Sequence, residues 1–161
     1  MRLKNEQYKS RPKIEKFISE GEFDNEIKTS ILDFASHLRA NKMSPQWASV
    51  NTWKFLYKGK RIGYIRLIEA DWYLGYIIKS DDVKFDNYAE IENLSELICN
   101  NFNYCDNCAP TGHCAPGQDI KFMNGNFKNV CWNDNLRFKI QNSFELERIK
   151  KLYEYSVKSI E

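Results

Sequence analysis

The chain has 161 residues, of which 42% are hydrophobic and 29% charged, and its formal net charge at pH 7 is +2. This length suits one globular domain that buries a core without help from a metal or disulfides, so we expect residues 1–161 to form a single domain. The small, mixed charge argues against a dedicated nucleic-acid binder, which carries a strongly basic face. The sequence shows no apolar run of membrane-spanning length and no signal-like start, so we expect a cytoplasmic protein without membrane association.

The first forty residues predict two helices. Apolar residues at helical spacing over residues 14–20 lie between Ser10, a candidate helix cap, and Gly21, a stop signal. A second helix is expected over residues 25–41, since four apolar side chains recur there on one helical face: Ile27, Ile31, Phe34 and Leu38.

Residues 50–78 change from helical to alternating periodicity. Three alternating runs, over residues 50–57, 61–68 and 72–78, are separated by turn sequences such as Lys58-Gly59-Lys60. This pattern predicts a three-stranded antiparallel meander. Apolar residues fall on both faces of the runs, so we expect helices to cover one face and other elements to cover part of the second.

The next segment predicts a helix and a hairpin. Asn87 and Glu90 have the spacing of a capping box ahead of an apolar stripe that reaches Phe102. Further on, Asn124-Gly125 separates two short apolar runs, which is a strong local signal for a β-hairpin.

The end of the chain predicts a strand and a long helix. Residues 136–140 alternate as in a half-buried strand, and Asn142 with Glu145 would cap a helix that packs on the sheet. The expected fold class is therefore α+β, with an antiparallel sheet flanked by N-terminal and C-terminal helices. That sheet combines the three-stranded meander with the later hairpin and strand.

A cysteine-rich loop over residues 104–118 carries the sharpest chemical pattern. Four of the five cysteines follow the spacing C-x2-C-x5-C-x16-C: Cys105, Cys108, Cys114 and Cys131. Thiols in a reducing compartment favour metal binding over disulfides, and zinc takes four such ligands in a tetrahedron. We therefore predict a zinc site formed by these four cysteines, with His113 as an alternative fourth ligand.

Other uses of the same cysteines stay open. An iron–sulfur cluster also accepts four thiolates, Cys105 and Cys108 have the spacing of a redox pair, and unliganded packing is a third possibility. Zinc held by three cysteines would leave room for an acidified water, with His113 or Asp106 as proton acceptor. The fifth cysteine, Cys99, is expected to pack as a small hydrophobe on a helix.

Outside the cysteines, the sequence offers weaker candidates. His37 stands alone on a helix and is expected to pack or face solvent. A basic hairpin tip could meet phosphate: Lys54, Lys58, Lys60, Arg61 and Arg66. The tryptophans could line a pocket or stack on bases, although Trp53 and Trp72 fit a core better: Trp47, Trp53, Trp72 and Trp132.

The stretch from Trp53 to Ile65, which includes Tyr57, Arg61 and Tyr64, precedes another aromatic strand and a C-terminal helix. This arrangement resembles small, mostly uncharacterised bacterial α+β proteins of the YdhG/YjbR-like group. The resemblance implies helices flanking an antiparallel sheet. Some members have been proposed as frataxin-like iron chaperones, which implies an acidic metal-delivering face, and only the run over residues 20–26 resembles one here.

These observations favour a zinc-stabilised binding or regulatory domain for an unknown small molecule or protein. No nucleophile–base pair, phosphate loop or nucleotide fingerprint occurs in the sequence, so an enzyme is not the first expectation. One alternative is a metal-handling protein or a thiol- or zinc-dependent enzyme that uses the Cys105–Cys131 cluster. A weak nucleic-acid-binding module is the other.

Overall fold

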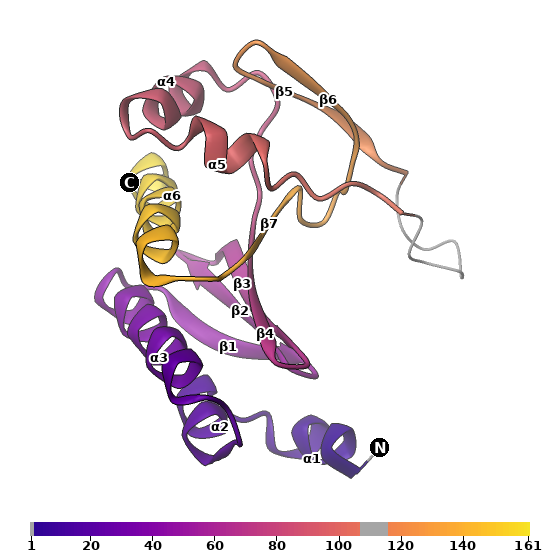
Figure 1. Cartoon of the computed structure of the whole chain (residues 1–161), viewed down its shortest axis with the longest axis vertical. Helices are drawn as coiled ribbons and strands as arrows, with labels where there is room; N and C mark the ends of the chain where they lie inside the picture. The colour runs from indigo at the N-terminus through magenta and orange to yellow at the C-terminus, as the bar shows by residue number, and fades with distance from the viewer. Residues whose placement is uncertain (1, 107–115) are drawn as a thin grey trace. The chain divides into compact units, whose positions relative to one another are not determined.

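The computed structural model describes the backbone of residues 2–106 and 116–161, and side chains from residue 4 onward within these ranges (Figure 1). Over the described residues the chain forms six helices, a five-stranded antiparallel sheet ordered β1-β2-β3-β4-β7, and a separate two-stranded hairpin of β5 and β6. The expected α+β class is confirmed. The later strand β7 joins the main sheet as expected, but the expectation that the hairpin also belongs to it is wrong, because β5 and β6 pair only with each other. The chain divides into two compact units, Met1–Leu74 with Lys139–Glu161 and Gly75–Phe138.

Three helices open the first unit: α1 (Arg2–Ser10), α2 (Ile14–Glu20) and α3 (Asn25–Ala40). Helices α2 and α3 were expected, and α2 ends at Gly21, whose backbone N–H donates to the carbonyl of Phe17. The role assigned to Ser10 is wrong, because Ser10 is the last residue of α1, a helix that the apolar pattern did not predict.

Four strands follow: β1 (Ser44–Ser49), β2 (Thr52–Tyr57), β3 (Lys60–Ile68) and β4 (Asp71–Tyr76). The meander of β2, β3 and β4 is confirmed, and β1 is an additional strand that pairs antiparallel with β2. Pro45 lies inside β1 and pairs with Phe55. An edge strand tolerates proline because one row of its backbone N–H groups has no strand to bond.

The turn between β2 and β3 explains their register. Tyr57 pairs with Lys60, so only Lys58 and Gly59 lie in the loop, with φ values of 46° and 77°. Two consecutive residues with positive φ are typical of a type I′ turn, whose twist matches that of the strands. The predicted turn at these residues is confirmed.

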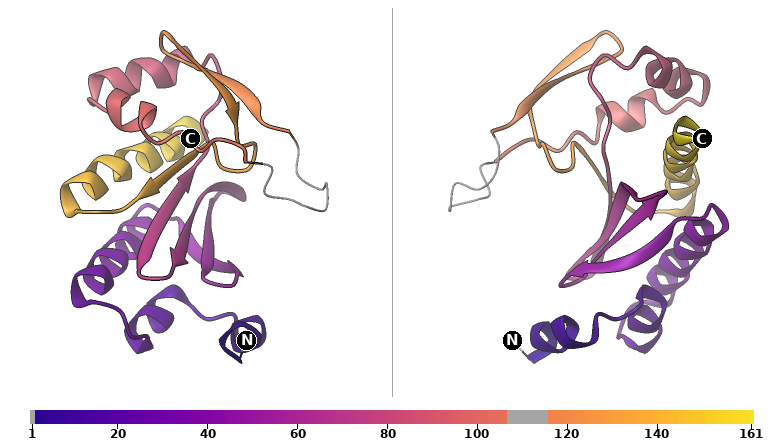
Figure 2. Two further views of the ribbon diagram at one scale, coloured as in Figure 1. Left: turned by 45° about the vertical axis from the view of Figure 1, so that its right-hand side comes forward. Right: turned by 180° about the vertical axis from the view of Figure 1, so that it is seen from behind.

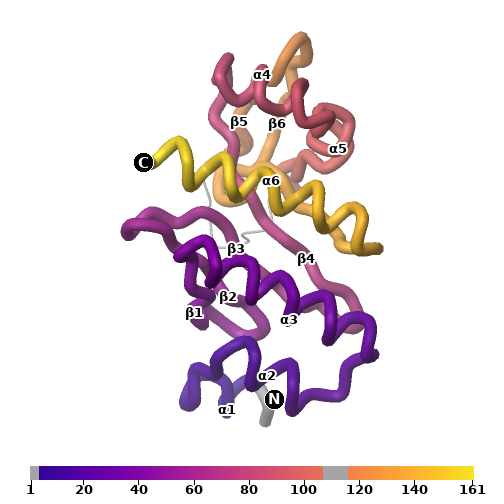
Figure 3. Tube along the Cα trace, turned by 90° about the vertical axis from the view of Figure 1, so that its left-hand side faces the viewer, coloured from indigo at the N-terminus to yellow at the C-terminus, as the bar shows by residue number. Residues whose placement is uncertain are grey.

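Helices α3 and α6 (Ser143–Ile160) pack on one face of the strands, as Figure 3 shows. Phe34 of α3 has its ring centroid 6.0 Å from that of Phe55 on β2 and 5.6 Å from that of Tyr153 on α6. The side chain of Asn142 accepts a hydrogen bond from the backbone N–H of Glu145 and so caps α6, as expected. The prediction that the C-terminal helix packs on the sheet is confirmed.

The second unit contains two helices, α4 (Val83–Ile91) and α5 (Ser95–Cys99), and the hairpin of β5 (Gln118–Phe122) and β6 (Gly125–Val130) (Figure 2). Strand β7 (Leu136–Lys139) follows, and its last residue, Lys139, is counted in the first unit. The core of the second unit is aromatic: the centroid of Phe122 lies 5.9 Å from that of Phe85 and 6.4 Å from that of Phe102.

Two details of this unit differ from expectation. Asp82, and not Asn87, caps α4, because its side chain accepts the backbone N–H of Phe85. The expected hairpin is confirmed, but its turn is Met123-Asn124, since Phe122 pairs with Gly125. Among the described residues, no helix is both long and apolar enough to cross a membrane.

Candidate functional site

Two of the predicted zinc ligands lie on neighbouring segments of the second unit. Tyr104 forms an antiparallel bridge with Val130, and the backbone N–H of Cys105 donates to the carbonyl of Asn129 at 2.7 Å. The N–H of Cys131 donates to the carbonyl of Asn103, also at 2.7 Å. Cys105 and Cys131 therefore occupy diagonal positions on one face of a short ladder, where Cα atoms are about 7–8 Å apart.

The two cysteines differ in their surroundings. Cys105 is half-buried, whereas Cys131 is 8% exposed and its Sγ lies 3.6 Å from Oδ1 of Asp134. The other oxygen of that carboxylate accepts two hydrogen bonds from Arg137, at 3.1 and 3.0 Å. The carboxylate beside the thiol is thus held in place by a cation.

The remaining predicted ligands, Cys108 and Cys114, and the alternative ligand His113 lie outside the described residues. Within the described ranges, no group of three or more histidine, cysteine, aspartate or glutamate side chains is arranged to hold a metal ion. The structure therefore places two of the four predicted ligands near each other, and the complete zinc site stays a prediction.

The expectation for Cys99 is wrong. This residue is exposed at the end of α5 and does not pack in the core, although partial burial of its thiol raises the pKa of that group. The five-residue helix α5 buries Leu97 and Ile98, so its next position turns away from the apolar interior.

His37 packs inside the first unit, one of the two expected outcomes. Its ring is stacked with Phe34 at 6.3 Å between centroids, and its Nε2 lies 3.7 Å from Oε1 of Glu154. That distance is too long for a hydrogen bond, and Nε2 is buried without any hydrogen-bond partner. Burial lowers the pKa of His37, and the positive charge of Lys150 lowers it further.

Sequence patterns did not predict a pocket that lies in the first unit, has a volume of about 820 Å³ and is lined entirely by residues of that unit. It lies between the first turns of α3, the start of β4 and the segment 139–147, which leads into α6. Three buried apolar side chains form its floor: Trp72, Ile140 and Leu146. The two helix starts were predictable from their capping residues, but only the tertiary structure brings them together.

Five carboxylates and one lysine line this pocket: Asp24, Glu26, Asp33, Asp71, Glu147 and Lys139. Lys139 forms an ion pair with Asp71 at 2.8 Å, and its hydrogen bond to that carboxylate raises the pKa of the lysine. Lys150 forms ion pairs with both Asp33 and Glu147. Two lysines thus neutralise part of the negative charge, and the lining remains net negative. The pocket suits a small molecule with an apolar part and hydrogen-bond donors.

The other candidates from the sequence are dispersed. Trp53 and Trp72 are buried, as expected, whereas Trp132 is largely exposed. The acidic residues over 20–26 are exposed between the end of α2 and the first turn of α3, and they belong to no metal-binding group among the described residues. The cations of the β2–β3 hairpin remain together on neighbouring strands.

Comparison of the chain with protein-family models, with curated proteins and with solved structures found no match.

Proposed function

We propose that the protein is a zinc-stabilised binding domain, in which zinc is held by four thiolates: Cys105, Cys108, Cys114 and Cys131. The observation that supports it is the pairing of residues 103–105 with 129–131, which puts Cys105 and Cys131 on one face of the same ladder. Two sulfurs bound to one tetrahedral zinc lie about 3.8 Å apart for bonds of about 2.3 Å. Side chains at diagonal ladder positions can reach that separation by leaning toward each other.

Cys108 and Cys114 would supply the other two thiolates, as their spacing in the sequence indicates. Four thiolates fill the tetrahedral coordination of zinc and leave no position for water or substrate. The metal then serves the fold, because the free energy of binding it becomes free energy of folding.

Zinc analysis of the purified protein tests this proposal. We expect about one zinc ion per chain in protein prepared under reducing conditions without added metal, and loss of that zinc in Cys105→Ser and in Cys131→Ser. Cys99→Ser is the matched control, because Cys99 lies on α5 outside the predicted cluster, and it should keep its zinc.

Wild-type protein that contains no metal under these conditions would contradict the proposal. Iron in place of zinc would instead favour the metal-handling alternative. Zinc that persists in both Cys105→Ser and Cys131→Ser would assign the metal to other residues.

The pocket of the first unit supports the binding part of the proposal. Its volume of about 820 Å³ lies in the range of small-molecule sites, and its apolar floor is surrounded by polar side chains. Small organic molecules that bind there should shift the NMR signal of the Trp72 indole. Ser30→Leu adds bulk to the pocket wall and should weaken the binding of these molecules. Ser36→Leu, on the exposed side of α3, should leave their binding unchanged.

A further inference from the structure

The β2–β3 hairpin concentrates positive charge. Residues 50–68 contain five lysines and arginines and no acidic residue: Lys54, Lys58, Lys60, Arg61 and Arg66. The whole chain has 24 basic and 22 acidic residues, so the rest of the chain is net negative. The net charge of +2 therefore hides a local basic surface.

Two of these cations lie over the ring of a single tyrosine, and a third is its partner on the neighbouring strand. The Cζ atoms of Arg61 and Arg66 lie 5.6 and 5.2 Å from the centroid of the Tyr64 ring, in the range of cation–π contacts. Lys54 on β2 is the residue directly opposite Tyr64 on β3. Directly opposed residues share a face of a sheet, so this set, the Tyr64 cluster, consists of Lys54, Arg61, Tyr64 and Arg66.

The cations of the Tyr64 cluster have no carboxylate partner. In the described part of the chain, none of Lys54, Arg61 and Arg66 lies within 4.0 Å of an acidic group, and Nε of Arg66 donates to Oγ1 of Thr52 at 3.4 Å. Like charges that gather without counter-charges repel one another, and an anion would relieve that repulsion.

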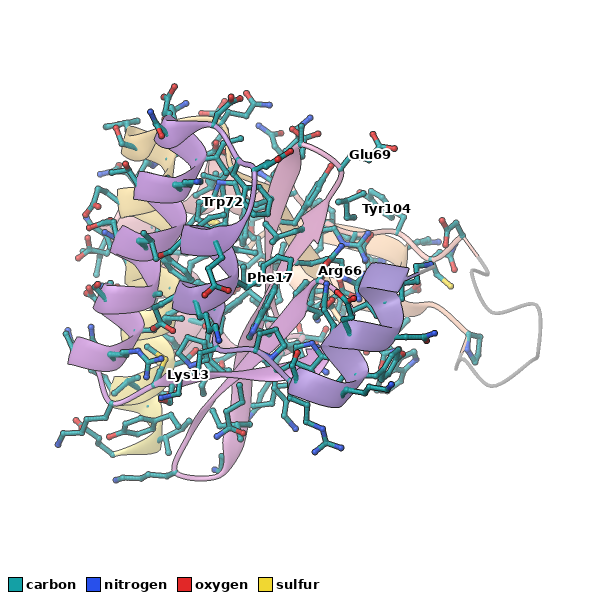
Figure 4. All side chains as sticks on the ribbon, turned by 90° about the horizontal axis from the view of Figure 1, so that it is seen from below. Lys13, Phe17, Arg66, Glu69, Trp72 and Tyr104 are labelled. Carbon is teal, nitrogen blue, oxygen red and sulfur yellow. The ribbon has the colours of Figure 1, made fainter. Side chains whose placement is uncertain are left out.

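The Tyr64 cluster lies on the face of the sheet that α3 and α6 do not cover. Phe55 on β2 contacts Phe34 of α3 and Tyr153 of α6, and Trp53 on the same face of β2 contacts Phe17 of α2. Lys54 lies between these two residues and points to the other face. Figure 4 shows Trp72 on the side of α3 and Arg66 on the opposite side of the strands. Arg61 is exposed, and Lys54 and Arg66 are half-buried.

We propose that the Tyr64 cluster binds single-stranded nucleic acid. Lysine and arginine contact the phosphates, and guanidinium planes stack on unpaired bases. Tyr64 is 3% exposed, so its ring supports the two guanidinium groups and does not itself stack on a base. Bases are open to stacking only in a single strand, which favours this ligand over a duplex or an acidic peptide.

This inference goes beyond the proposed function, because it depends neither on zinc nor on the acidic pocket. The Tyr64 cluster belongs to the first unit and the cysteines to the second. Zinc analysis and nucleic-acid binding are separate measurements, so the failure of either proposal is recognised without the other.

Fluorescence anisotropy of the full chain with dye-labelled 20-nucleotide oligo-dT and oligo-U at low salt provides the test. We expect the oligonucleotides to bind at low salt. The logarithm of the association constant should fall linearly with the logarithm of the salt concentration, with a slope of about −2 for three phosphate contacts in a single strand. Arg61→Gln/Arg66→Gln should weaken binding about tenfold or more and reduce the slope to about −0.7. Lys54→Gln should reduce the magnitude of the slope by about 0.7, the contribution of one phosphate contact.

Lys84→Gln/Lys128→Gln is the control, since it removes the same charge from exposed positions of the other unit. It should bind as the wild-type protein does, and thermal unfolding would establish that all variants are folded. Three results would overturn the proposal: no binding at low salt, equal loss in the control variant, or equal affinity for duplex DNA, polyglutamate or vesicles of anionic lipid.

Discussion

Lys150 on α6 donates a hydrogen bond to Asp33 on α3, with 2.7 Å between Nζ and Oδ2, although the lysine is only 7% exposed. Its ammonium group also bonds Glu147, one turn back on α6. Burial by itself lowers the pKa of Lys150, but the hydrogen bonds and charges of the two carboxylates outweigh burial and raise that pKa overall. The lysine is therefore charged inside the unit and joins the two helices that cover the sheet.

Removing Asp33 should destabilise the protein. We expect Asp33→Ala to lower the free energy of unfolding by about 1 kcal/mol, because the buried ammonium group of Lys150 loses one of its two carboxylate partners. The effect stays this small because the carboxylate of Asp33 is exposed and water screens its charge. Lys150→Met should stay within about 1 kcal/mol of the wild-type protein, since it removes the buried charge itself. Chemical denaturation measures both changes.

Glu20→Ala is the matched control for Asp33→Ala. Glu20 forms an exposed ion pair with Lys16 at 4.0 Å, one helical turn away on α2. We expect its loss to cost less than about 0.5 kcal/mol. Equal effects of the two substitutions would show that the bond between Lys150 and Asp33 does not stabilise the fold.

His37 should make stability depend on pH below neutrality. Burial and Lys150 lower its pKa below 6.5 in the folded state, while Glu154, Glu147 and Asp33 oppose them. The unfolded state then binds the proton more tightly, so His37 favours folding above about pH 6.5 and this contribution is lost as the pH falls toward the folded-state pKa. The free energy of unfolding of His37→Gln should fall less between about pH 7 and 5 than that of the wild-type protein. Parallel curves for the two proteins would refute the assignment.

The β2–β3 turn should respond to two substitutions in opposite directions. Gly59→Ala should cost about 1 kcal/mol, because φ at Gly59 is +77° even though a Cβ atom there would meet no neighbour. Lys58→Asn should stabilise the protein by a few tenths of a kcal/mol, because Asn-Gly is the preferred pair for a type I′ turn. Thermal unfolding tests both, and a stabilised Gly59→Ala would exclude this turn.

A chelator should distinguish stabilisation by bound zinc from any effect of the cysteine side chains themselves. If zinc stabilises the second unit, a strong chelator should lower the unfolding temperature of the wild-type protein and of Cys99→Ser. The same chelator should leave Cys105→Ser unchanged, because that variant has no zinc to lose. A chelator effect of the same size in Cys105→Ser would contradict the proposed ligand set.

Periodicity alone was enough to predict the elements that carry a continuous apolar stripe. Trp53, Phe55 and Tyr57 alternate along β2 and are all buried, and the apolar stripes of α3 and α6 face the core as predicted. These elements can be predicted from the sequence, because exposing an apolar stripe to water costs free energy whichever element packs against it in the fold.

Tertiary contacts decided the elements without such a stripe. Helix α1 has no regular apolar face, and it is tied to the turn after β1 by Gln7, which bonds both the side chain of Asn51 at 2.6 Å and its backbone N–H at 2.8 Å. Strand β1 contains Pro45, which disfavours a strand locally and is tolerated only because β1 lies at the sheet edge.

The candidate sites also differ in how far the sequence alone could predict them. The spacing of the cysteines indicated a metal site, and backbone pairing then brought Cys105 and Cys131 to one face of a ladder. The pocket and the Tyr64 cluster join residues that local pattern does not relate: the starts of two helices in one case, opposed positions on two strands in the other. Sequence periodicity reports which side chains are buried, but strand register and helix packing decide which polar groups meet, because those contacts join residues far apart in the chain.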